Sequence, residues 1–208
     1  MLLPSMMSRL LALLFSLVLM NAASASAAPQ PVAAGAPLPA ATVRTTAGEA
    51  VSLRAATGGK PTVLIFYRGG WCPYCTKHLA ALAEIEGELR AAGFQLVALS
   101  PDRPEKLRAQ PAHAGLGYTL LSDSKAEAMR ALGLAFRVED GLVKTYKEQY
   151  GIDLEADSGE THHLLPHPAV FIVDAAGMIR FAHVNPDYKV RLSGEEILAA
   201  ARAIAAER

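Results

Sequence analysis

Two cysteines, Cys72 and Cys75, are the only cysteines among the 208 residues of the chain, and two residues separate them. The apolar run 62–67 and a glycine pair at 69–70 precede them, and a helical pattern follows. A thiol pair placed between a buried strand and the start of a helix can pass between a dithiol and a disulfide. The spacing therefore predicts a redox-active pair in an oxidoreductase.

Pro73 predicts that a helix begins directly after Cys72, because a proline at the first helical position loses no hydrogen bond. Cys72 is then the N-cap, where its sulfur can accept the backbone N–H of Tyr74 or Cys75. The helix dipole favours a thiolate at this position. We therefore expect Cys72 to have the lower pKa and to attack substrates, and the less exposed Cys75 to resolve the intermediate.

Two other uses of a cysteine pair are weaker interpretations. A disulfide that closes a loop of about four residues stabilises a fold by only about 2 kcal/mol, so a structural bridge would link more distant segments. A structural zinc site usually takes its four ligands from two closely spaced pairs. The second pair would have to come from His162, His163 or His167, which are poorly spaced and far from the cysteines in the sequence. We expect neither a metal nor a cofactor.

Four neighbouring residues have open roles at this point. Trp71 is expected beside the dithiol, either as a substrate wall or as an ordinary turn aromatic. Arg68 either holds an anionic thiolate or is a surface charge. His78, three residues after Cys75, is expected to be a surface histidine rather than a proton donor. Pro168 precedes an apolar segment, where a cis peptide bond would place its backbone opposite the cysteines.

The rest of the chain alternates between strand and helix patterns. Strands are expected at 41–44, 51–53, 62–67, 94–100, 118–121, 169–174 and 178–184. Helices are expected from 73 to about 92, from a cap at 102–105 to about 112, from 122–123 to about 132, and from a capping box at Ser193 and Glu196 onward. Segment 133–165 has no clean period and is interpreted as an insertion with a helix near 143–150.

Parallel strands early in this order and an antiparallel pair at its end predict a mixed central sheet with helices on both faces. The expected fold is therefore α/β and thioredoxin-like, with an added N-terminal β-hairpin. It is expected to occupy residues 41–208, which is enough for one domain with its own core.

The first 27 residues are expected to be a secretory signal peptide. A basic start at Arg9, the apolar run 10–20 and small residues at 23–28 are typical of such a segment. Residues 28–40, rich in Ala and Pro, are expected to be a flexible lead-in. The protein is therefore expected to be exported, to the periplasm or another extracytoplasmic space, without stable membrane association after cleavage. The formal net charge is zero and no basic run is present, so nucleic acid is not an expected partner.

Three motifs resemble the peroxiredoxin-like branch of the alkyl hydroperoxide reductase/thiol-specific antioxidant family. They are FYRGGWCPYC at 66–75, ALSPD at 98–102 and FIVDAAG at 171–177, and the resemblance covers about residues 36–205. It implies a thioredoxin fold and a cysteine thiolate that reduces a peroxide, becoming a sulfenic acid that a second thiol resolves. It also favours the cis form of Pro168.

The chain departs from the family's usual pattern around the reactive cysteine. Arg68 stands where that family has a proline, Cys72 where it has a threonine or serine, and Cys75 at the peroxidatic position. Pro168 stands where the family has an arginine. Cys72 and Pro168 are the residues that a thioredoxin has at these two positions. The buried acid of thioredoxin, however, is replaced here by Phe66.

The expected function is that of a thiol-dependent oxidoreductase in which Cys72 and Cys75 cycle between dithiol and disulfide. Its substrate is a peroxide or a protein disulfide, and an external thiol reductant protein supplies electrons. One alternative is a thioredoxin-type thiol-disulfide oxidoreductase without peroxidase activity, and another is a non-enzymatic binding module of the same fold. Family position makes Cys75 the attacking residue, whereas helix geometry makes it Cys72.

Overall fold

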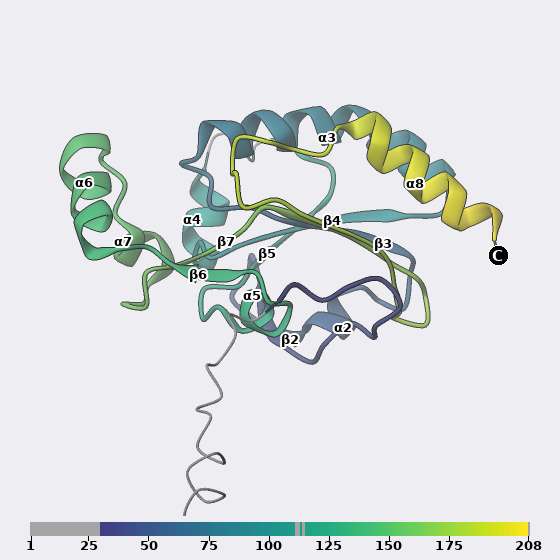
Figure 1. Ribbon diagram of the computed structural model, residues 1–208, viewed down its shortest axis with the longest axis horizontal. Coiled ribbons are helices and arrows are strands. Elements are labelled where there is room, and N and C mark those ends of the chain that lie inside the picture. Colours follow the sequence, from purple (N-terminus) through teal and green to yellow (C-terminus); the bar gives the residue numbers. More distant parts are fainter. Residues whose placement is uncertain (1–29, 111–112, 114, 208) are drawn as a thin grey trace, which may run out of the picture. The chain divides into compact units, whose positions relative to one another are not determined.

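The computed structural model describes residues 30–110, 113 and 115–207, and its centre is a seven-stranded mixed sheet (Figure 1). Strands β3, β4 and β5 run parallel to one another. The β1–β2 hairpin joins β5, and β8 and β9 follow β3, all by antiparallel pairing. The predicted mixed sheet with an added N-terminal hairpin is therefore confirmed. Across the sheet the order is β2 (Ala50–Ser52), β1 (Thr42–Thr45), β5 (Thr119–Ser122), β4 (Gln95–Ser100), β3 (Thr62–Phe66), β8 (Ala169–Val173) and β9 (Ile179–Val184).

Helices cover both faces of this sheet, as predicted (Figure 1). Helices α3 (Pro73–Ala91) and α8 (Gly194–Ala206) pack on one face, and the short helices α2 (Leu53–Ala56) and α5 (Glu127–Ala131) pack on the other. All five residues of β3 are buried because its alternate side chains enter the two opposite cores. This strand is therefore held firmly on both sides at the point where it leads into the cysteine loop.

The predicted capping box of α8 is confirmed, with reciprocal bonds between Ser193 and Glu196. The N-cap of helix α4 (Pro104–Ala109) is Arg103, within the predicted cap at 102–105, and the helix ends before the predicted residue 112. The Asp102 carboxylate points into the protein, where it accepts a hydrogen bond from the backbone N–H of Gly70 at 2.8 Å. A buried backbone N–H of the cysteine loop needed an acceptor, and Asp102 supplies it.

Segment 133–165 is more regular than its sequence predicted. Strands β6 (Ala135–Arg137) and β7 (Leu164–Pro166) form a second, two-stranded sheet, and between them lie α6 (Asp140–Tyr150) and α7 (Leu154–Ser158). The helix expected near 143–150 is confirmed within α6. Elements of three to five residues are too short to leave a readable period, which is why the other three were missed.

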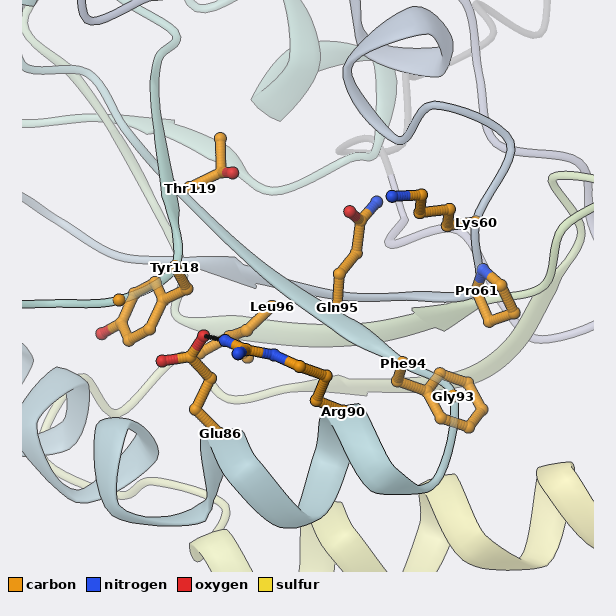
Figure 2. A pocket seen from close by; sticks show the side chains of 11 residues that line it. Lys60, Pro61, Glu86, Arg90, Gly93, Phe94, Gln95, Leu96, Tyr118 and Thr119 are labelled. Carbon is orange, nitrogen blue, oxygen red and sulfur yellow. Dashed lines mark hydrogen bonds and ion pairs between the residues drawn. The ribbon is translucent and has the colours of Figure 1, made fainter.

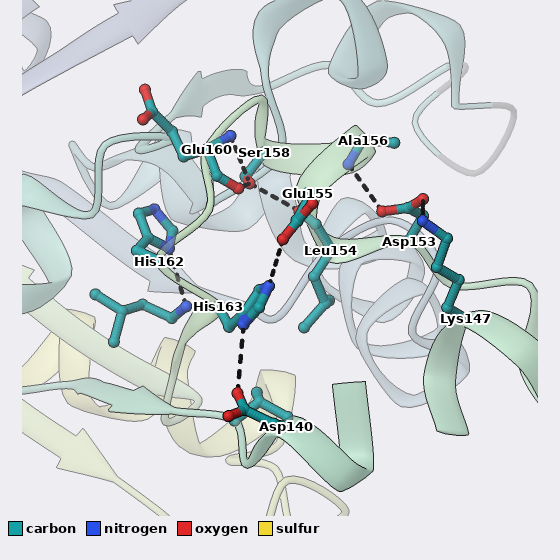
Figure 3. Close-up of polar contacts among 12 residues, drawn as sticks. Asp140, Lys147, Asp153, Leu154, Glu155, Ala156, Ser158, Glu160, His162 and His163 are labelled. Atoms are coloured by element: carbon teal, nitrogen blue, oxygen red, sulfur yellow. Dashed lines mark hydrogen bonds and ion pairs between the residues drawn. The ribbon is translucent and has the colours of Figure 1, made fainter. Parts of the chain in front are cut away.

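Polar contacts tie this insertion together around α7 (Figure 3). His163 Nε2 lies 2.8 Å from the Glu155 carboxylate, and Lys147 Nζ lies 2.8 Å from Asp153. His162 Nδ1 accepts the backbone N–H of Leu164, so this ring belongs to the local turn. The described residues include no group of three or more metal-ligating side chains placed to hold an ion.

The predicted lead-in differs in the part that the structure describes. Val32 donates its backbone N–H to the Leu132 carbonyl at 3.0 Å, and Leu38 donates to Gly177 at 2.8 Å. These residues therefore lie against the domain instead of leading freely into it. The predicted signal peptide lies outside the described residues. Among the described helices, none has both the length and the apolar character needed to cross a bilayer.

Candidate active site

The two cysteines lie where β3 ends and α3 begins. Cys72 is the N-cap of α3, with extended backbone angles, and Pro73 is the first helical residue, as predicted. Gly69 has a φ of +148°, and a Cβ atom there would lie 2.4 Å from the Trp71 indole nitrogen. The loop can therefore pass beneath Trp71 only because this position is glycine.

Both thiols are free and buried. The exposed fraction is 2% for Cys72 and 0% for Cys75. The backbone N–H of Cys75 bonds to the carbonyl of Cys72 at 2.9 Å, and no cap hydrogen bond reaches the Cys72 sulfur. The sulfur-to-amide cap bond expected from the sequence is therefore not formed, because the carbonyl takes the amide instead.

The two sulfurs have opposite electrostatic environments. Hydrogen bonding from the Cys75 thiol is the largest influence on Cys72 and lowers its pKa from 9.0 to about 6. Burial opposes this shift, whereas the charges of Arg68 and Arg191 act in the same direction as the thiol. Burial, aided by the neighbouring thiolate, raises the pKa of Cys75 well above its ordinary value. At neutral pH the pair is therefore one thiolate and one thiol.

Arg68 is not a surface charge, since only 4% of it is exposed. Its Nη2 atom donates to the Tyr146 hydroxyl at 2.6 Å. Its guanidinium also lies 4.3 Å from the ring centroid of Tyr188 and 5.2 Å from that of Trp71. The cation is therefore fixed beside the dithiol by three aromatic side chains from three separate segments.

Trp71 joins the cysteine loop to the insertion. Its ring centroid lies 6.0 Å from that of Tyr146 on α6, and it packs against the small apolar cluster of Val138, Leu154 and Leu165. The sequence left segment 133–165 without a role. In the structure this segment supplies Tyr146, and with it one wall of the site.

Arg191 is a site residue that the sequence analysis missed. It lies between β9 and α8, and its Nη2 atom contacts the Cys75 sulfur at 3.1 Å. It is 116 residues from Cys75 in the chain, and it belongs to no periodic pattern that would have marked it.

Two expectations about neighbouring residues were wrong. The described residues contain no cis peptide bond, so Pro168 is trans. Its carbonyl accepts Asn185 N–H at 3.1 Å, as the chain runs extended from β7 into β8, a course that suits a trans proline. His78 is buried, with 8% exposure, because it follows Cys75 by one turn on the inner side of α3. Its Nε2 bonds to the Leu192 carbonyl, and burial lowers its pKa to about 4.

A cavity of about 420 Å³ lies away from the dithiol, at the opposite end of α3 (Figure 2). Glu86 and Arg90 on α3 line it together with Gln95 and Thr119 at the starts of β4 and β5. Neither cysteine borders this cavity. This cavity therefore gives no route to the sulfurs.

A paired thiolate and thiol at a helix N-terminus define the class as a thiol-dependent oxidoreductase. The model of the AhpC/TSA family matches residues 34–182. Peroxiredoxin Bcp of Escherichia coli is 30% identical over 131 residues, which are 63% of this chain and 71% of that protein. The chain therefore belongs to the AhpC/TSA family of peroxiredoxin-like proteins.

Solved structures show the same fold. Reduced Prx3 of Vibrio vulnificus, crystallised with hydrogen peroxide, aligns with a TM-score of 0.66 and 22% identity, covering 82% of this chain and 99% of that one. Peroxidoxin BcpB of Mycobacterium tuberculosis aligns with a TM-score of 0.63 and 18% identity, covering 83% and 98%. The predicted thioredoxin-like fold is therefore confirmed.

Proposed function

We propose that the protein is an exported thiol peroxidase that cycles Cys72 and Cys75 between dithiol and disulfide. The observation that carries this proposal is the placement of the two thiols, with Cys72 as the N-cap of α3 and Cys75 buried within its first turn against Arg191. The lowered pKa of Cys72 and the raised pKa of Cys75 agree with this placement. The thiolate is the nucleophile in attack on a peroxide, and a thiol in contact with it is placed to resolve the product.

The proposed reaction has two steps. The Cys72 thiolate attacks the terminal oxygen of a hydroperoxide ROOH, the O–O bond breaks, and the leaving alkoxide takes a proton to become ROH. Cys72 is then a sulfenic acid. Cys75 loses its proton and attacks the Cys72 sulfur, hydroxide leaves and takes that proton as water, and the disulfide forms. Two electrons from an external thiol restore the dithiol.

Cys72 is the proposed attacking residue, although Cys75 occupies the family's peroxidatic position. The lower pKa and the slightly greater exposure of Cys72 both support this order. Arg191 donates to the Cys75 sulfur, so it is placed to stabilise Cys75 as a thiolate in the second step. The buried acid that is absent at Phe66 is then not required, because a cation favours loss of the proton.

A peroxide suits this site better than a protein disulfide. Only 2% of Cys72 is exposed, which favours a small peroxide, because a folded partner would have to displace Arg68 and its aromatic neighbours to reach the sulfur. The test mixes pre-reduced protein with hydrogen peroxide, and separately with a protein disulfide, and follows oxidation of the pair. Faster oxidation by peroxide is expected. Faster oxidation by the protein disulfide would favour the thioredoxin-type alternative.

Export rests on the first 27 residues, and it is tested separately. The full chain, produced in a Gram-negative bacterium, is expected in the periplasmic fraction, with a mass that corresponds to cleavage after Ala25 or Ala27. An uncleaved chain in the cytoplasmic fraction contradicts this part of the proposal and leaves the thiol chemistry unaffected.

A further inference from the structure

Two guanidinium groups beside the dithiol, Arg68 buried and Arg191 half-buried, have buried donor atoms without partners. Arg68 Nε and the Nε and Nη1 atoms of Arg191 are buried, and none of them has a hydrogen-bond acceptor among the described residues. Within the same part of the chain, neither arginine forms an ion pair with a carboxylate. Buried N–H groups without acceptors are costly, so donors that stay unpartnered point to a ligand that supplies the acceptor.

The charge balance at these arginines changes with the redox state. In the dithiol state the Cys72 thiolate offsets part of their positive charge, as the effect of both arginines on its pKa indicates. A disulfide carries no charge on either sulfur. Oxidation therefore leaves the Arg68 and Arg191 cations without the anion that faces them in the reduced protein.

The surroundings of these arginines favour a small ligand. Arg191 shares the lining of a small hollow with His78 and His183, and the buried His183 Nε2 also has no partner among the described residues. Val190, which is 49% exposed, lies at the same hollow and connects it with the surface. The hollow has a volume of about 10 Å³, roughly that of one water, and neither Arg68 nor a cysteine lines it. A folded partner therefore has no room there, and a carboxylate has to enter from the Val190 side to form charge-assisted bonds with Arg191.

We propose that Arg68 and Arg191 form a carboxylate subsite for the reductant, and that the reductant is a small thiol that carries a carboxylate. This inference rests on the proposed function, because it names the electron donor of the same cycle. The donor's thiolate attacks the Cys72 sulfur and breaks the Cys72–Cys75 bond, and Cys75 leaves as a thiolate and takes a proton. A second donor thiolate attacks the mixed disulfide, which releases the donor's disulfide and restores the Cys72 thiolate.

The test compares three small thiols of different charge. The purified protein is oxidised with diamide, so that the reduction can be followed whether or not peroxide reacts. It is then reduced with 3-mercaptopropionate, 2-mercaptoethanol or cysteamine, and each rate is divided by the thiolate concentration and corrected for the thiol's basicity. The anionic thiol is expected to react about tenfold faster than the neutral one, and the cationic thiol slowest, with a difference that shrinks at high salt.

Substitutions at the arginines show which side chain causes the preference for the anionic thiol. Arg191→Gln is expected to reduce the anionic preference to about twofold, and Arg191→Lys to keep most of it, because lysine retains the charge. Arg202→Gln removes a surface arginine that pairs with Glu88, and it is expected to leave the preference unchanged. Equal corrected rates for the three thiols would overturn the proposal. So would an anionic preference that survives both Arg191→Gln and Arg68→Gln, or rapid reduction by a thioredoxin without any charge preference among small thiols.

If peroxide fails to oxidise the dithiol while the anionic preference is present, the proposed peroxidase function is wrong and the carboxylate subsite stands. If peroxide oxidises the dithiol and the anionic preference is absent, the carboxylate subsite is wrong and the proposed peroxidase function stands. The two proposals can therefore fail independently.

Discussion

Removing the Cys75 sulfur should raise the pKa of Cys72. The Cys75 thiol is the largest influence that lowers this pKa, and Cys75→Ala removes it. A hydrogen bond to a charged group contributes about 1.5–3 kcal/mol, and one pKa unit corresponds to about 1.4 kcal/mol. The variant should therefore move the pKa of Cys72 from about 6 upward by about one to two units, since Arg68 and Arg191 remain.

The assay is the rate of iodoacetamide alkylation of Cys72 as a function of pH, read by mass. The wild-type thiol should be about nine-tenths ionised at pH 7, so its rate should already be close to the plateau. Cys75→Ser is the matched control, because its hydroxyl can still donate, and it should shift the midpoint less than Cys75→Ala. A wild-type midpoint near 9, or identical midpoints in all three proteins, would show that Cys75 does not lower the pKa of Cys72.

Two other predictions concern stability. Burial raises the pKa of Asp102 from 3.8 to about 6, so the folded state binds this proton more tightly than the unfolded state does. The contribution of Asp102 to stability should therefore fall by about 3 kcal/mol as pH rises from about 4 to 6. Asp102→Asn should remove this part of the pH dependence in denaturant titrations, while the part due to Asp123, whose pKa is also raised, should remain. An unchanged slope in the variant would contradict the prediction. Tyr146→Phe, which removes the acceptor for Arg68, should lower the urea-unfolding free energy by about 1.5 kcal/mol, while the exposed Tyr150→Phe should not.

The features that were predictable from the sequence depend on local patterns. Proline is favoured at the first position of a helix, so Pro73 and the helical pattern after it were enough to predict Cys72 as the N-cap. The apolar segments 62–66 and 169–173 are buried on both faces of the sheet, and their continuous apolar character predicted central strands.

The features that were missed depend on contacts between distant segments. Arg191 reaches Cys75 across 116 residues, Tyr146 reaches Arg68 across 78, and Asp102 reaches Gly70 across 32. These are single polar residues in loops or on a short helix, where no periodicity indicates the inward direction of a side chain. The cis form of Pro168 was expected from its position before an apolar strand and was favoured by the resemblance, but the peptide bond is trans.

The central claim is that Cys72 attacks the peroxide and Cys75 resolves the product. It is tested most directly by a single turnover of reduced Cys75→Ser and Cys72→Ser proteins with hydrogen peroxide, in the presence of a sulfenic-acid trap read by mass. Rapid trapping is expected at Cys72 in the Cys75→Ser protein, and almost none at Cys75 in the Cys72→Ser protein. Rapid trapping at Cys75, with Cys72 unreactive, would contradict it and assign the attack to the family's peroxidatic position.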